Sequence, residues 1–186
     1  MTEDEKDKTD LSISMNKAQL YSFLTPLPAV IPLGLLYLWR WELSLEISLL
    51  ELALFYTIGA VLFCVGVVAH EFIHGLTWKV LGRKPRDAIE FGVQWKALTP
   101  YAHCKEPLRA RAYRWGAAMP GLALGILPSV AGVLTGNGWV MLFGIIFTLA
   151  AGADVIILWL IRSVGPEQLV EDHPSKAGCY VLDGEE

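Results

Sequence analysis

The sequence predicts an all-α integral membrane protein with about four transmembrane helices and a small cytoplasmic β-hairpin between the second and third helices. Hydrophobic residues make up 54% of the 186 residues and charged residues only 18%, a composition too apolar for a soluble domain of this length. The mean hydropathy is +0.44. Four apolar runs are each long enough to cross a hydrocarbon core about 30 Å thick. Nine of the fifteen Lys and Arg residues gather in one connection between two of these runs.

The chain starts with a polar segment and a proline-containing apolar run. Residues 1–19 are predicted to form a polar cytoplasmic tail, because they lack the short positive region and the cleavage site of a signal peptide. The run 20–39 predicts the first transmembrane helix. It contains Pro26, Pro28 and Pro32. Each proline removes a backbone donor, so a kinked or re-entrant segment is the alternative.

The second predicted span, residues 52–79, ends at a clear helix-stop signal. Gly82 and Pro85 flank basic residues directly after it, and glycine, positive charge and proline are typical of a helix C-terminus. The basic cluster lies between Lys79 and Arg114. Since positively charged connections stay on the inner side of a membrane, this connection is predicted to be cytoplasmic.

A short alternating pattern within this connection predicts the β-hairpin. Residues 88–95 approximately alternate apolar and polar side chains, and residues 97–103 follow after a one-residue break. Pro100 is compatible only with an edge position. One strand edge would then stay open for an extended peptide, whereas a plain connecting loop is an equally weighted alternative.

The last two predicted spans are residues 115–134 and 139–161. The third span is rich in small residues, including Gly121 and Gly125, which allow close helix packing in lipid. Pro120 is expected to kink or loosen this helix near its cytoplasmic end. After the fourth span, residues 162–186 are predicted to form an acidic cytoplasmic tail, in which residues 179–182 could form a short strand. The protein is therefore expected to be multi-pass, with both termini in the cytoplasm.

Three ionisable residues interrupt the apolar second span. His70 and His74 lie one helical turn apart on the same face, and Glu71 lies beside them. Such a His-Glu-x-x-His pattern predicts a Zn²⁺ site in which the histidines bind the ion and the glutamate acts as general base. Ionisable groups are costly at membrane depth, so a functional role is favoured over a structural one.

Asp154 is predicted to be the third zinc ligand. It is the single charged residue of the fourth span and requires a partner there. His74 precedes the basic Arg83 by nine residues and Asp154 precedes Arg162 by eight. At 1.5 Å per residue, both side chains lie roughly 12 to 14 Å from these charges and are level with each other.

Other assignments of these residues are less consistent with the sequence. His103 and His173 are reserve metal ligands. They rank below Asp154, because neither lies in an apolar span. A di-iron carboxylate site would need a second Glu-x-x-His. The net charge of −4 gives no indication of a nucleic-acid partner. Cys64, Cys104 and Cys179 match neither a disulfide framework nor a zinc-finger pair.

Four short motifs resemble those of the putative zincin peptidases, a membrane family related to the site-two proteases. They are His70-Glu71-Phe72-Ile73-His74-Gly75, Cys104-Lys105-Glu106-Pro107, Gly152-Ala153-Asp154 and Asp172-His173-Pro174. The resemblance covers most of the chain from about residue 50 onward and implies that His70, His74 and Asp154 are arranged as in site-two proteases. We expect the membrane-embedded zincin-like domain to extend over residues 20–161. No PDZ-like domain accompanies it, so substrate selection is expected from the core or from a partner.

The sequence favours a zinc metalloprotease that hydrolyses peptide bonds in or next to the membrane, with Glu71 as general base. We expect membrane lipid around the helices and a peptide or membrane-protein substrate. A non-catalytic metal-binding adaptor or sensor is the alternative. A metal transporter is less favoured, because a transport path normally needs several coordinating carboxylates within the membrane.

Overall fold

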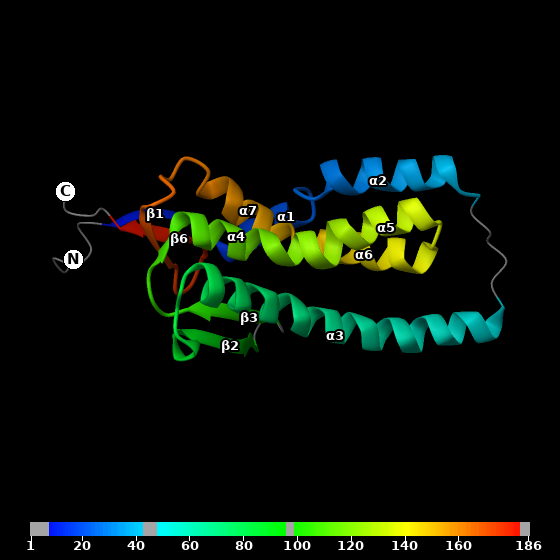
Figure 1. The fold of residues 1–186 in the computed structure, drawn as a ribbon, viewed down its shortest axis with the longest axis horizontal. Coiled ribbons are helices and arrows are strands. Elements are labelled where there is room, and N and C mark those ends of the chain that lie inside the picture. The colour runs from blue at the N-terminus through cyan, green and yellow to red at the C-terminus, as the bar shows by residue number, and fades with distance from the viewer. Residues whose placement is uncertain (1–7, 43–47, 96–98, 183–186) are drawn as a thin grey trace.

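The computed structural model describes residues 8–42, 48–95 and 99–182, and shows an elongated, mostly helical molecule with β-structure at one end (Figure 1). We call this end the sheet end and the opposite end the distal end. The predicted all-α class is corrected here, because two antiparallel sheets accompany the helices. Residues 1–7 and 183–186 of the predicted tails, and residues 97–98 of the predicted hairpin, lie outside the described residues.

The first predicted span is two helices rather than one. Helix α1 spans Met15–Ser22 and α2 spans Leu27–Arg40, with turns between them. Pro26 and Pro28 lie at the start of α2. The first N–H groups of a helix have no partner within the helix, so the missing proline donors break no helical hydrogen bond there. Of the two predictions for residues 20–39, the kinked segment is therefore a better description than a regular transmembrane helix.

Helix α3, Leu49–Leu81, is the longest element, and at 1.5 Å per residue its 33 residues extend about 50 Å. The buried residues of its sheet-end half are Gly75, which the hairpin covers, and one stripe of four residues. Gly66, His70, His74 and Trp78 recur every four residues on this stripe, whereas neighbours such as Phe72 are exposed. Residues four apart share a helix face, so the two histidines and Trp78 all point into the protein.

The third predicted span is a continuous helix with a π-helical segment in its middle. Helix α4, Ala110–Pro120, leads into the π-helix η3, Gly121–Ile126, and then into α5, Leu127–Thr135. Pro120 cannot donate a backbone hydrogen bond, and the wider π-helical pattern follows directly after it. This is the loosening that the sequence predicts at this position.

The fourth predicted span is broken into α6, Gly138–Ala150, and α7, Gly152–Leu160, with a bend of 43° between them. The side chain of Asn137 starts α6 by accepting hydrogen bonds from two backbone N–H groups. Within the described part of the chain, three helical segments are long and apolar enough to span a membrane, and the bent pair supplies a fourth if it is counted as one span. The three segments are Met15–Arg40, Leu52–Leu81 and Ala110–Thr135.

The predicted hairpin is present at the sheet end. Strands β2, Ile89–Gln94, and β3, Thr99–Cys104, pair antiparallel, and the short 3₁₀ helix η2, Arg86–Ala88, precedes them. Phe91 of β2 packs over Gly75, which holds the hairpin against α3.

A second sheet, in the strand order β1-β6-β5-β4, was not predicted beyond a short strand near residues 179–182. Its strands are β1, Lys8–Ile13; β4, Leu108–Arg109; β5, Leu169–Asp172; and β6, Ala177–Leu182. Part of the predicted N-terminal tail is thus a strand paired with β6. Ion pairs join Lys8 to Glu171 and Lys176 to Asp10, at 2.9 and 2.8 Å.

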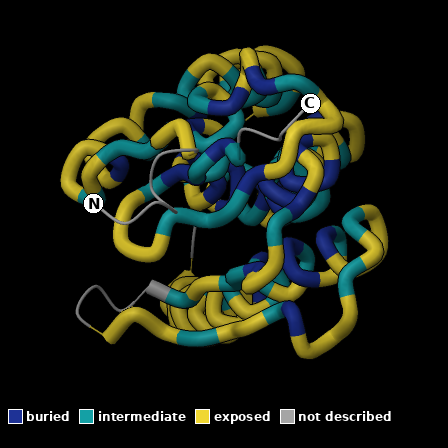
Figure 2. The backbone as a smooth tube through the Cα atoms, turned by 90° about the vertical axis from the view of Figure 1, so that its left-hand side faces the viewer, coloured by how far each residue is buried: buried dark blue, intermediate teal, exposed yellow. Residues whose placement is uncertain are grey.

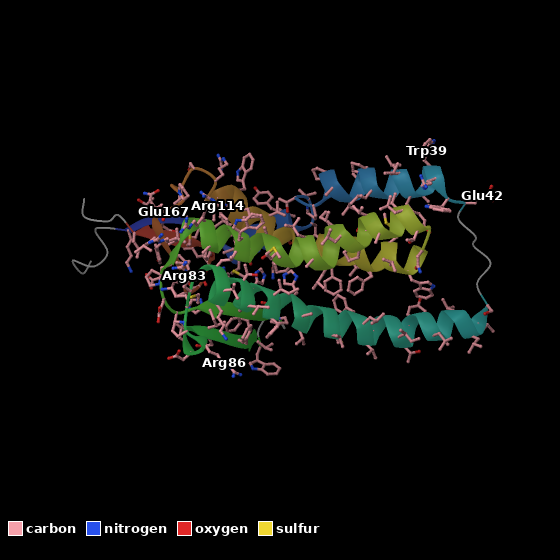
Figure 3. The ribbon with its side chains drawn as sticks, viewed as in Figure 1. Trp39, Glu42, Arg83, Arg86, Arg114 and Glu167 are labelled. Carbon is pink, nitrogen blue, oxygen red and sulfur yellow. The ribbon has the colours of Figure 1, made fainter. Side chains whose placement is uncertain are left out.

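The sheet end has a core built from both helices and strands. Figure 2, which views the molecule from this end, shows buried residues between the elements and exposed residues around the outside. Charged side chains also gather here: Arg83, Arg86, Arg114 and Glu167 lie at the sheet end, whereas Trp39 and Glu42 lie at the distal end (Figure 3).

Two of the three cysteines belong to this core, and we expect them to resist thiol reagents. Burial raises the pKa of the Cys104 thiol and raises that of Cys179 to about 12, and only the thiolate reacts. At pH 7.5 a small membrane-permeant maleimide should label only Cys64, which is exposed on α3. Mass spectrometry before and after unfolding in detergent measures this, and rapid labelling of native Cys179 would contradict the described sheet.

Candidate metal site

The site starts from two histidines on the buried stripe of α3. His70 and His74 are 8% and 7% exposed, and their ring centroids lie 4.8 Å apart with the rings nearly perpendicular. Possible ligand atoms of His70, Glu71 and His74 all lie within 4.8 Å of one another. The regular helix therefore brings the three motif residues together as their spacing predicts.

Asp154, in the first turn of α7, lies against both histidines. Its Oδ2 is 3.2 Å from Nε2 of His70, and its Oδ1 is 3.4 Å from Nε2 of His74. A carboxylate is also electrostatically favourable at a helix N-terminus. All four residues predicted for the site thus lie together, contributed by α3 and α7.

The break between α6 and α7 determines where Asp154 lies. Gly152 packs so closely against the end of α1 that an added Cβ would overlap the carbonyl of Ser22. Thr25 Oγ1 donates a hydrogen bond of 2.9 Å to the Gly152 carbonyl oxygen. The N-terminal helices therefore hold the bend that directs α7, and with it Asp154, towards α3.

The donor set and its spacing fit a zinc ion. Ligand atoms 2.0 to 2.2 Å from a tetrahedral zinc lie about 3.4 Å apart, close to the two separations between Asp154 and the histidines. Oδ2 of Asp154 is buried and makes no hydrogen bond among the described groups, although Nε2 of His70 lies 3.2 Å from it, and a buried oxygen of this kind requires a compensating contact. A cation held by Asp154 and the two Nε2 atoms would provide it.

The second ring nitrogen of His74 is fixed by α4. Nδ1 lies 2.9 Å from the carbonyl oxygen of Gly116, so Nδ1 carries the proton and donates it. Nε2 then keeps its lone pair for a metal, and such outer contacts normally orient histidine ligands.

Aromatic stacking also holds the His74 ring. Trp78 stacks on His74 with a centroid distance of 5.5 Å, and Tyr113 stacks on Trp78 at 5.9 Å. Gly116 is needed for this packing, because an added Cβ would overlap Nε1 of Trp78. Trp78 lies four residues after His74, so the helix spacing alone puts it on the same face. The contributions of Tyr113 and Gly116 could not be predicted from the sequence, because both residues lie on another helix.

Glu71 and both histidines line an open cavity of about 720 Å³, and Glu71 differs from the histidines because it is half-buried where they are buried. The cavity lies between α3, the β2–β3 hairpin and the turn that joins β5 to β6. The backbone of Ala102 on β3 lies within hydrogen-bonding reach of the Glu71 carboxylate. Glu71 can therefore contact water or a substrate in the cavity that the two histidines and Asp154 also line.

The two reserve histidines line the same cavity but have structural partners. His173 Nδ1 accepts hydrogen bonds from the backbone N–H groups of Ser175 and Lys176, and Nε2 lies 3.0 Å from the hydroxyl of Tyr180. Both ring nitrogens of His173 thus stabilise its own turn. His103 pairs through Nδ1 with Asp172 at 2.9 Å. Among the described residues, neither belongs to the His70, Glu71 and His74 cluster.

Comparison with known proteins identifies a family for the larger part of the chain. A family model described as "putative zincin peptidase" matches residues 63–169, a range that includes His70, Glu71, His74 and Asp154. Strand β6 and Asp172 lie beyond it. No curated protein and no solved structure matches the chain.

We expect zinc binding to depend on Asp154 and not on His173. The purified protein should contain about one zinc per chain, and Asp154→Ala should weaken binding at least tenfold, because it removes one of three ligands. His173→Gln is the matched control, and elemental analysis after dialysis against a graded chelator measures both. Zinc loss in the control with retention in Asp154→Ala would contradict this ligand assignment.

Gly116→Ala should weaken zinc binding without removing a ligand. The added methyl group displaces Trp78 and loosens His74, and changes in such outer contacts typically cost about 10- to 100-fold in metal affinity. Gly59→Ala is the control, because an added Cβ at Gly59 on α3 has no neighbour within 4 Å. Equal zinc affinities of the two variants would argue against positioning by Trp78.

Proposed function

Because the chain belongs to the putative zincin peptidase family, we propose that it is a membrane-embedded zinc metallopeptidase that hydrolyses peptide bonds in or next to the membrane. The convergence of His70, His74 and Asp154, with Glu71 left open to the cavity, carries this proposal. A structural zinc site would close its fourth position with another ligand.

Each residue of the site has a distinct role in the proposed reaction. His70, His74 and Asp154 would hold zinc, which supplies a Lewis acid for the scissile carbonyl and lowers the pKa of water. Glu71 accepts a proton from the attacking water and passes it to the leaving amine. The Gly116 carbonyl and Trp78 keep His74 in its orientation.

The distribution of side chains supports insertion in a membrane with the sheet end in the cytoplasm. Large apolar residues such as Leu35 and Val65 are 62% and 60% exposed on α2 and α3, as expected for surfaces that face lipid. Arg83, Arg86 and Arg114 gather at the sheet end, and Trp39 lies at the distal end. The pairing of β1 with β6 at the sheet end supports a cytoplasmic location for both of these strands, and with them for the two ends of the chain.

The hairpin supports an extended peptide as substrate. Strand β3 pairs with β2 on one side, and Pro100 to His103 line the cavity beside Glu71. An unwound segment of a membrane protein could pair with this strand by main-chain hydrogen bonds. Two helix-borne histidines joined by an aspartate from a later helix also support a relationship to the site-two proteases.

A non-catalytic metal-binding adaptor or sensor is the second candidate, because it would use the same three ligands. It has no need for Glu71, so this residue separates the two functions.

Glu71→Gln should retain zinc and abolish cleavage of a membrane-anchored reporter peptide. Loss of a positioned general base typically lowers the rate about 10²- to 10⁴-fold. Glu106→Gln, which breaks a surface ion pair with Lys84, is the matched control. Cleavage and zinc content are measured on the same preparations. Undiminished cleavage by Glu71→Gln would contradict the mechanism, whereas zinc binding without cleavage by the wild type would favour the adaptor.

A further inference from the structure

His103 is a titratable side chain on the cavity wall that the proposed metal site does not use. It lies on β3, directly after Ala102, whose backbone approaches Glu71. Its side chain is 34% exposed and lines the same cavity as His70, His74 and Asp154. His103 is therefore near the general base without being grouped with the metal ligands.

Asp172 holds His103 in one orientation. Its Oδ2 lies 2.9 Å from Nδ1 of His103 and accepts a hydrogen bond of 3.3 Å from the backbone N–H of Cys104. The hydroxyl of Tyr113 donates to its other oxygen. Donors from β3 and α4 thus fix the carboxylate of Asp172 on β5. Nε2 of His103 has no hydrogen-bond partner among the described groups and remains available to the cavity.

The surroundings of His103 favour its protonated form. The hydrogen bond to Asp172 is the largest influence and raises the pKa of His103, whereas burial acts in the opposite direction. Glu90, which faces His103 across the hairpin, and Glu171 raise it further. Lys105 pairs with Glu90 at 2.9 Å and partly offsets its charge. The cation has an N–H at both ring nitrogens, so Nε2 can donate.

Such a donor would accelerate peptide hydrolysis beyond the Lewis-acid effect that zinc supplies. When water attacks the carbonyl carbon, the carbonyl oxygen acquires negative charge, and donors aimed at this oxygen stabilise the transition state. Glu71 and Asp154 are acceptors when ionised, and Nδ1 of His74 already donates to Gly116. Nε2 of His103, on the strand β3 that lines the cavity, is suited to donate a hydrogen bond to this carbonyl oxygen.

We propose that His103 is a further catalytic residue of this peptidase, whose Nε2–H donates to the carbonyl oxygen of the scissile peptide as that oxygen becomes negative, and that Asp172 is its positioning residue. The inference rests on the proposed peptidase function. In the first step the water oxygen bonds to the carbonyl carbon and Glu71 takes the water proton. In the second the carbon–nitrogen bond breaks and Glu71 delivers that proton to the amine. His103 keeps its own proton throughout.

The test compares the full-length wild type with His103→Gln, Asp172→Asn and the surface control Glu106→Gln, using a fluorescence-quenched peptide anchored by one transmembrane segment. His103→Gln should lower kcat about 100-fold, as for loss of one oxyanion donor, with KM and zinc content changed less than about threefold.

The wild type should lose activity as pH rises through the raised pKa of His103. Asp172→Asn should move this loss to lower pH, an effect that general destabilisation would not produce.

A second measurement does not depend on turnover. A phosphinic pseudopeptide of the reporter sequence mimics the tetrahedral intermediate and carries its negative oxygen. It should bind the zinc-loaded wild type at least tenfold more tightly than His103→Gln, as measured by displacement of a fluorescent ligand. Equal binding, or binding to neither, would overturn the role of His103, as would unchanged kcat in His103→Gln.

These outcomes separate the two proposals. Cleavage by the wild type with an unaffected His103→Gln removes the catalytic role of His103 and leaves the peptidase function standing. Absence of cleavage by the zinc-loaded wild type removes the peptidase function, and the pseudopeptide then decides whether His103 contacts a negatively charged carbonyl oxygen.

Discussion

The contact of Asp154 with His70 and His74 is the constraint on which the rest of the structure depends. A carboxylate enclosed by apolar helices is strongly disfavoured unless a partner compensates its charge, and both partners lie on another helix. To reach them, the fourth apolar segment breaks at Ala151, and α7 leaves at 43°. The close fit of Gly152 against the end of α1 holds that break. One buried charge thus accounts for a bent helix and for the docking of the N-terminal helices.

The features predicted correctly from the sequence are those with a local signal or a high energetic cost. The spacing of His70 and His74 defines a helix face, and depth in the apolar segments was enough to pair Asp154 with them. Pro26 and Pro28 indicated an irregular start to α2. The four-stranded sheet could not be predicted in the same way, because residues 8–13 pair with residues 177–182 and no local pattern specifies so distant a partner. The contacts of Asp172 with His103, Cys104 and Tyr113 could not be predicted either, because these residues are also distant in sequence.

The two sheets and the metal site form one connected structure. Asp172 joins β5 to the β3 strand through His103 and Cys104, and to α4 through Tyr113. Tyr113 continues this connection to His74 through the Trp78 ring. Contacts in a connected hydrogen-bond network are generally not additive. A continuous series of contacts thus links His74 to a strand more than ninety residues away in sequence.

Pairing of β1 with β6 also sets the order of events during biosynthesis. Residue 8 leaves the ribosome long before residue 182, and at 5 to 20 residues per second the interval is about 9 to 35 s. During this time the apolar segments can already enter the bilayer, whereas the wall of the cavity formed by the β5–β6 turn does not yet exist. Until residues 177–182 have been synthesised, the nascent chain therefore lacks both this wall of the cavity and the partner strand of β1.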